Sequence, residues 1–163
     1  MIVSVLSLIG VFVAVYLLLW KIGVLGRLAC GSTGCDTVQT SQYSDFLGIP
    51  VALYGVGGFI FMFAVSLVGL QPRWLGRKGP TLLLLVSSGV GVAFSAYLTY
   101  LEAYVINAWC QWCVASAIIV SLVFVVSLVG LLTWAVVEVE GVAKSAYLPR
   151  EQRTRLVGAE DRR

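Results

Sequence analysis

Residues 2–22 read IVSVLSLIGVFVAVYLLLWKI, an apolar run whose single charge, Lys21, lies at its end. A run of about 20 apolar residues is long enough to cross the hydrocarbon core of a bilayer as one helix. Three further runs of the same kind follow, at residues 51–70, 81–101 and 114–137. The sequence therefore predicts four membrane-spanning helices.

The amino-acid composition excludes an ordinary soluble domain. Of 163 residues, 60% are hydrophobic and 12% are charged. A globular domain of this size has too little interior to bury so much apolar surface, whereas helices satisfy their own backbone hydrogen bonds and are stable in lipid. We expect an all-α membrane protein, a four-transmembrane-helix bundle in one membrane domain (residues 1–140) with a polar tail (residues 141–163).

The first apolar run differs from a cleavable signal peptide. It is longer than the apolar part of such a peptide, no basic residues precede it, and no small-residue cleavage site occurs before Lys21. We expect the first helix to be retained in the mature protein.

Lysine and arginine are unevenly distributed outside the four runs. Nine of the eleven lie in the connection at residues 71–80 and in the tail, whereas the other segments contain only Lys21 and Arg27. Segments rich in these residues stay in the cytoplasm. The sequence thus predicts cytoplasmic termini and an exported location for the loop 23–50. The net charge of +3 reflects this topology and indicates no nucleic-acid partner.

The exported loop 23–50 is the longest segment outside the apolar runs. It contains the sequence CGSTGC at residues 30–35, in which the glycines allow a tight turn. Asp36 or Thr37 can cap a short helix ending at Gly48, and Pro50 suits the start of the next helix. We expect a short loop helix over the exported end of the bundle.

Four cysteines form two pairs, Cys30/Cys35 in this loop and Cys110/Cys113 at the start of the fourth run. A Cys-x-x-Cys pair at a helix N-terminus is suited to redox chemistry, because the helix stabilises the thiolate that attacks a disulfide. Both pairs are predicted to face an oxidising compartment. They therefore indicate thiol–disulfide exchange at a membrane surface.

Two other uses of the four cysteines stay open at this stage. The pairs could be structural disulfides that staple the outer loops of a four-span scaffold, or a four-thiolate zinc or iron–sulfur site. Exported thiols are more often oxidised than held as metal ligands, and the chain has no histidine to act as a ligand or general base. We therefore expect no metal site.

The loop sequence CDTVQTSQYSDFLGIP at residues 35–50 completes a pattern that covers nearly the whole chain. With Cys30 before it, four apolar spans and a late Cys-x-x-Cys, it resembles the vitamin K epoxide reductase family. The resemblance is closest to microbial members that support disulfide formation. It implies that Cys113 reduces a quinone, that Cys110 exchanges with Cys35, and that Cys30 exchanges with an external thiol protein.

The resemblance also suggests residues near the quinone. Ser41, six residues after Cys35, corresponds to a serine that helps hold the loop helix near the active site. An asparagine and a tyrosine that contact the quinone in vertebrate members correspond to Val51 and Ala117. Ser41, Val51 and Ala117 are therefore cofactor-binding candidates beside Cys113, although the last two leave the quinone oxygens without identified hydrogen-bond partners.

These patterns predict a quinone-dependent thiol oxidase of a bacterial or archaeal cell membrane. An exported thioredoxin-fold protein would reduce the loop pair, and electrons would pass to the second pair and then to a quinone of the menaquinone, ubiquinone or vitamin K type. Reduction of a quinone epoxide is the alternative activity, and Val51 and Ala117 argue against it. Glu102, after the third run, is expected to be a solvated interfacial charge, with proton donation to the reduced quinone as the alternative.

Overall fold

The computed structural model describes residues 1–26, 30, 34–73 and 78–147, the last seven of these by their backbone alone. The chain divides into two compact units, Met1–Leu128 and Val129–Arg163. All four cysteines lie in the first unit.

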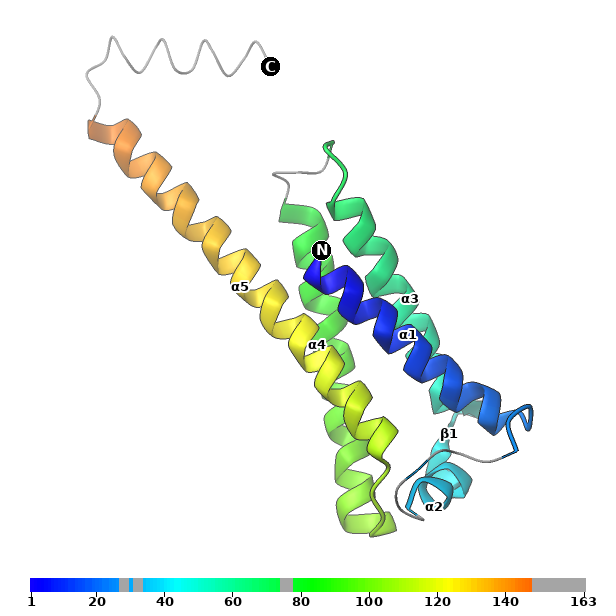
Figure 1. Cartoon of the computed structure of the whole chain (residues 1–163). Helices are drawn as coiled ribbons and strands as arrows, with labels where there is room; N and C mark the ends of the chain where they lie inside the picture. The colour runs from blue at the N-terminus through cyan, green and yellow to red at the C-terminus, as the bar shows by residue number, and fades with distance from the viewer. Residues whose placement is uncertain (27–29, 31–33, 74–77, 148–163) are drawn as a thin grey trace. The chain divides into compact units, whose positions relative to one another are not determined.

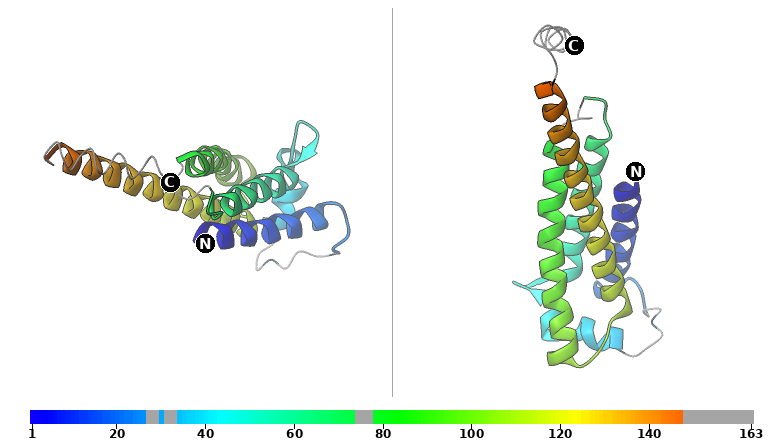
Figure 2. Two further views of the ribbon diagram at one scale, coloured as in Figure 1. Left: turned by 90° about the horizontal axis from the view of Figure 1, so that it is seen from above. Right: turned by 90° about the vertical axis from the view of Figure 1, so that its left-hand side faces the viewer.

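Four helices long and apolar enough to cross a membrane confirm the predicted fold class. They are α1 (Ile2–Lys21), α3 (Val51–Gly69), α4 (Lys78–Tyr100), which continues as the π-helical turn η2 (Leu101–Ile106), and α5 (Gln111–Tyr147). In the first unit, α1 and α4 run alongside α3, and the short helix α2 lies across one end of the bundle (Figures 1 and 2). The N-terminus, the C-terminal end of α3 and the start of α4 lie at the other end.

The loop between α1 and α3 has more structure than the sequence predicted. It contains α2 (Gly34–Thr40), the 3-10 turn η1 (Gln42–Ser44) and a hairpin of β1 (Asp45–Phe46) and β2 (Ile49–Pro50). The expected helix as far as Gly48 is wrong. The backbone is extended at Ser41, and Leu47 and Gly48 have φ angles of 55° and 78°, so they form the two-residue turn of a hairpin.

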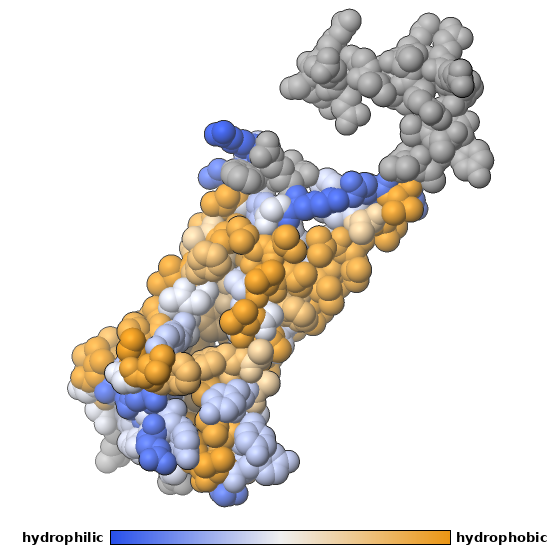
Figure 3. Space-filling view, turned by 180° about the vertical axis from the view of Figure 1, so that it is seen from behind, coloured by the Kyte–Doolittle hydropathy of each residue, from blue (hydrophilic) through white to orange (hydrophobic). Residues whose placement is uncertain are grey.

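Small residues allow the helices of the first unit to pack closely. A Cβ added to Gly10 would collide with the ring of Phe59, and one added to Gly91 would lie 2.8 Å from Val120. The buried core consists of Ala14, Phe59, Met62, Leu84, Val120 and Val123. Around it, hydrophobic side chains face outward along the helices, and hydrophilic ones gather at the end that carries α2 and at the opposite end (Figure 3). This surface suits a bilayer and agrees with an integral membrane protein.

Candidate functional site

The two cysteine pairs meet at the α2 end of the bundle. Cys30 and Cys35 form a disulfide, whereas Cys110 and Cys113 are free thiols. Each pair has one fully buried member, Cys35 or Cys110, and one partly exposed member. The two fully buried cysteines belong to one apolar cluster with Val38. Cysteines 75 positions apart in the sequence are therefore neighbours in the fold.

Gly34 explains how the loop helix comes so close to the second pair. It directly precedes Cys35, and its backbone lies against the backbone of Trp109, which directly precedes Cys110. A Cβ at this position would lie 2.5 Å from the Trp109 carbonyl oxygen. Only a residue without a side chain allows this approach.

The end of the third span shapes the segment that leads to Cys110. After η2, Asn107 adopts a left-handed conformation with a φ of 52°, which asparagine tolerates better than most residues. The backbone N–H groups of Asn107 and Ala108 both donate to the carbonyl oxygen of Glu102, in the second case at 3.1 Å. The chain thereby turns back towards α5 within four residues, 107–110.

Glu102 is buried in this turn, so its expected role as a solvated charge is wrong. Its side chain is 3% exposed, and its Oε2 atom accepts a hydrogen bond from the backbone N–H of Cys110 at 3.2 Å. The π-helical turn carries the carboxyl group inward. A π-helical turn inside an α-helix is rare and is often found at a functional site.

The environment of Cys110 favours its thiolate. A hydrogen bond with the Cys113 thiol makes the largest contribution, and with backbone N–H groups at the start of α5 it holds the pKa of Cys110 below its ordinary value. Burial and the nearby Glu102 act in the opposite direction but do not outweigh these effects. The N-terminal end of a helix is a favourable place for a thiolate.

Lys21 fastens the loop to the end of α1. Its ammonium group donates to the backbone carbonyl oxygen of Gln39 at 3.0 Å, to the hydroxyl of Ser44, and to Asp45 Oδ2 at 3.3 Å. The side chain of Lys21 is 19% exposed and that of Asp45 is 44% exposed. The single charge at the end of the first apolar run is thus a link that holds α2 and η1 in place.

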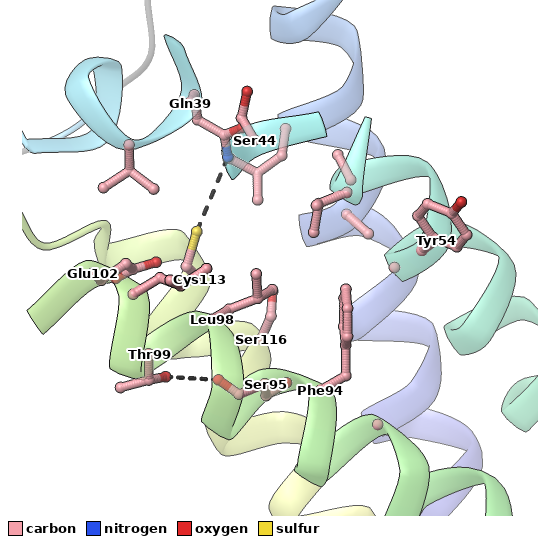
Figure 4. A pocket seen from close by; sticks show the side chains of 18 of the residues that line it. Gln39, Ser44, Tyr54, Phe94, Ser95, Leu98, Thr99, Glu102, Cys113 and Ser116 are labelled. Atoms are coloured by element: carbon pink, nitrogen blue, oxygen red, sulfur yellow. Dashed lines mark hydrogen bonds between the residues drawn. The ribbon is translucent and has the colours of Figure 1, made fainter. Parts of the chain in front are cut away.

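A pocket opens beside Cys113, lined by residues of all four long helices and of the loop (Figure 4). Its cavity volume is about 180 Å³, and its walls are largely apolar. Ser41 and Val51, two of the predicted candidates, line it, whereas Ala117 lines a separate depression between α4 and α5. Gln39 and Glu102 line the pocket next to Cys113.

The pocket fits the ring of a quinone. A protein cavity of about 150 Å³ accepts benzene, so this pocket has room for a flat ring, and its apolar walls suit one. Its polar side chains near Cys113 are available to the ring oxygens. Gln39 was missed by the sequence analysis because nothing in the spacing of the loop residues indicates which side chains of α2 face the pocket. Among the described residues no cluster of three or more potential ligands is placed to hold a metal ion.

Four membrane-spanning helices, a disulfide next to a reduced dithiol, and an apolar pocket at that dithiol define a class of membrane proteins that carry out thiol–disulfide chemistry. The chain belongs to the vitamin K epoxide reductase family, whose sequence model matches residues 1–128. Family membership confirms the resemblance drawn from the cysteine pattern. It indicates an oxidoreductase that acts on thiols and is linked to a quinone.

Proposed function

We propose that the protein reoxidises an exported thioredoxin-fold protein and passes the electrons to a membrane quinone. The arrangement of the cysteines carries this proposal. The buried cysteines Cys35 and Cys110 share a cluster, Cys30 is partly exposed, and Cys113 lines the pocket. In this order the four thiols make a continuous relay from the donor protein to the quinone.

Two disulfide exchanges move electrons from the outer pair to the inner pair. When Cys110 and Cys113 are joined, the Cys35 thiolate attacks the sulfur of Cys110, and Cys113 leaves as a thiolate. Cys30 then attacks Cys35, the bond between Cys35 and Cys110 breaks, and Cys110 leaves. Once the Cys113 thiolate has taken up a proton, its thiol again donates to Cys110, and the lowered pKa of Cys110 assists the second step because a thiol of low pKa is the better leaving group.

The two exchanges end with the disulfide pattern seen in the fold, in which Cys30–Cys35 is closed and both inner thiols are reduced. Oxidation of Cys110 and Cys113 to a disulfide, followed by reduction of the Cys30–Cys35 disulfide by the reduced donor protein, whose own two thiols become a disulfide, completes the cycle. In the oxidation, two S–H bonds are lost and one S–S bond forms, and two electrons and two protons leave with the quinone, which supplies the electron chemistry when bound. Glu102 is the only carboxyl group among the described residues that line the pocket, and we assign it the transfer of a proton.

The proposal places the α2 end of the bundle outside the cytoplasm. Arg73 and Lys78 flank the connection between α3 and α4 at the opposite end, and lysine and arginine favour the cytoplasmic side. The cysteines then face an oxidising compartment, where a thioredoxin-fold donor can deliver electrons.

Anaerobic quinone reduction by the purified protein tests the function. A reduced thioredoxin-fold protein or a small dithiol supplies electrons, and wild type is compared with Cys113→Ala and Cys30→Ala. Cys113→Ala should abolish reduction with either donor, because it removes the thiol next to the quinone. Cys30→Ala should abolish it with the protein donor alone. Failure of wild type to reduce any of several quinones would overturn the proposal.

A further inference from the structure

The residues that the family resemblance suggested as quinone contacts, Val51 and Ala117, cannot donate a hydrogen bond to a quinone oxygen. Val51, at a position where the family resemblance suggested a polar contact, has no polar side-chain atom, and Ala117 lies outside the pocket. A carbonyl oxygen buried without a donor costs free energy. The donor must therefore come from another residue that lines the pocket.

Four of the seven hydroxyl-bearing residues that line the pocket already donate to the backbone, and a fifth, Ser44, is bound by Lys21. A hydroxyl has one hydrogen to donate, and four lining hydroxyls already donate theirs to carbonyl oxygens. These bonds are Ser41 to Val38 at 2.7 Å, Tyr54 to Phe46 at 3.3 Å, Thr99 to Ser95 at 2.9 Å and Ser116 to Trp112 at 3.0 Å. Donation to a ligand would break a bond that each of them now makes.

Gln39 has donor capacity to spare. Its amide carries two hydrogens, and its Nε2 atom lies 4.0 Å from Cys113 Sγ, a long contact to a weak acceptor. The side chain extends from α2 towards the sulfur (Figure 4). The residue is 8% exposed, and its backbone carbonyl oxygen accepts a hydrogen bond from Lys21 at 3.0 Å. This bond holds the backbone of α2 in place, and the buried side-chain amide lies next to the sulfur that the proposed function makes the electron donor.

We infer that Gln39 donates a hydrogen bond from Nε2 to the quinone oxygen nearest Cys113. The inference rests on the proposed function and names the group that recognises the acceptor. A neutral carbonyl oxygen is a modest acceptor, but negative charge develops on this oxygen as the two electrons from Cys110 and Cys113 arrive. A fixed donor aimed at developing charge lowers the barrier more than it strengthens binding. Gln39 keeps its hydrogens throughout, because the protons come from the thiols.

The test compares Gln39→Leu with Gln42→Leu, a matched control at an exposed position of the same loop. A short-chain quinone is titrated into each protein and its dissociation constant is measured by quenching of tryptophan fluorescence. Reduction of the same quinone by the prereduced protein is followed in a single turnover. Gln39→Leu should raise the dissociation constant about 3- to 10-fold and slow reduction roughly 10- to 100-fold. Gln42→Leu should leave both within about twofold of wild type.

Electron uptake from the donor protein should stay at the wild-type rate in Gln39→Leu, which shows that the loop is folded. Gln39→Met provides a second variant of nearly the same size, whose thioether has no hydrogen to donate, and it should show the same losses. Wild-type binding and wild-type reduction in both Gln39 variants would overturn the inference. The proposed function fails in a different way, because then wild type itself would reduce no quinone.

Discussion

The two cysteine pairs are held by different kinds of structure. The outer pair belongs to a loop of short elements, in which α2 has seven residues and Lys21 supplies a fastening at the end of α1. The inner pair lies at the start of the long helix α5, and the buried carboxyl group of Glu102 accepts a hydrogen bond from the backbone N–H of Cys110. This difference matches the proposed roles of the two pairs. The outer pair exchanges disulfides with a donor protein, and the inner pair holds a thiol beside an apolar pocket.

The largest effect is expected from a change in the inner region. In Glu102→Gln an amide oxygen can still accept the hydrogen bond from Cys110, but the side chain can no longer take up and release a proton. Quinone reduction should fall roughly 100-fold, as is typical when a general acid or base is removed. Single-turnover reduction by prereduced protein measures this rate, and Glu140→Gln, at an exposed position of α5, is the control. An unchanged rate would mean that another group transfers the proton and that the role of Glu102 is structural.

A smaller effect is expected at the contact between the two regions. Gly34→Ala places a Cβ against the carbonyl oxygen of Trp109, so that α2 must move away and separate Cys35 from Cys110. Turnover with the protein donor should fall about 10-fold, since a misplacement of about 1 Å can cost as much as 100-fold. The steady-state rate of quinone reduction measures the change.

Gly26→Ala is the control for this substitution, because an added Cβ at Gly26 meets no atom of the described residues within 4 Å. Its turnover should match that of wild type. Equal rates in Gly34→Ala and Gly26→Ala would mean that the close approach of the loop to Trp109 is unnecessary for exchange between the pairs.

The fold could be predicted from the sequence because the bilayer imposes simple rules. Apolar runs of helix-spanning length have few alternative structures in lipid, and the helix at residues 2–22 was placed to within one residue of its observed end at Lys21. The hairpin was missed because Leu47 takes up a left-handed conformation, which is uncommon for a leucine. Leu47 lies within the segment predicted to be helical, so nothing in the sequence indicated a turn at this residue.

The candidate site could be predicted only in part. The cysteines stood out by their spacing, and the roles given to them stay predictions. The burial of Glu102 depends on a π-helical turn, and the position of α2 at Gln39 depends on a hydrogen bond from Lys21, a contact between residues 18 positions apart. Such contacts are set by the packing of separate elements, which hydropathy and spacing do not report.

The contact between the buried cysteines is the central feature, and selective crosslinking tests it most directly. The double variant Cys30→Ser/Cys113→Ser leaves Cys35 and Cys110 as the only thiols, and Cys35→Ser/Cys110→Ser leaves the two partly exposed ones as its control. Mild oxidation in membranes should join Cys35 to Cys110 within single chains, detected by protection from alkylation in a mass spectrum. The control should stay largely reduced. Free Cys35 and Cys110 after oxidation, with a bridge formed in the control, would contradict the relay.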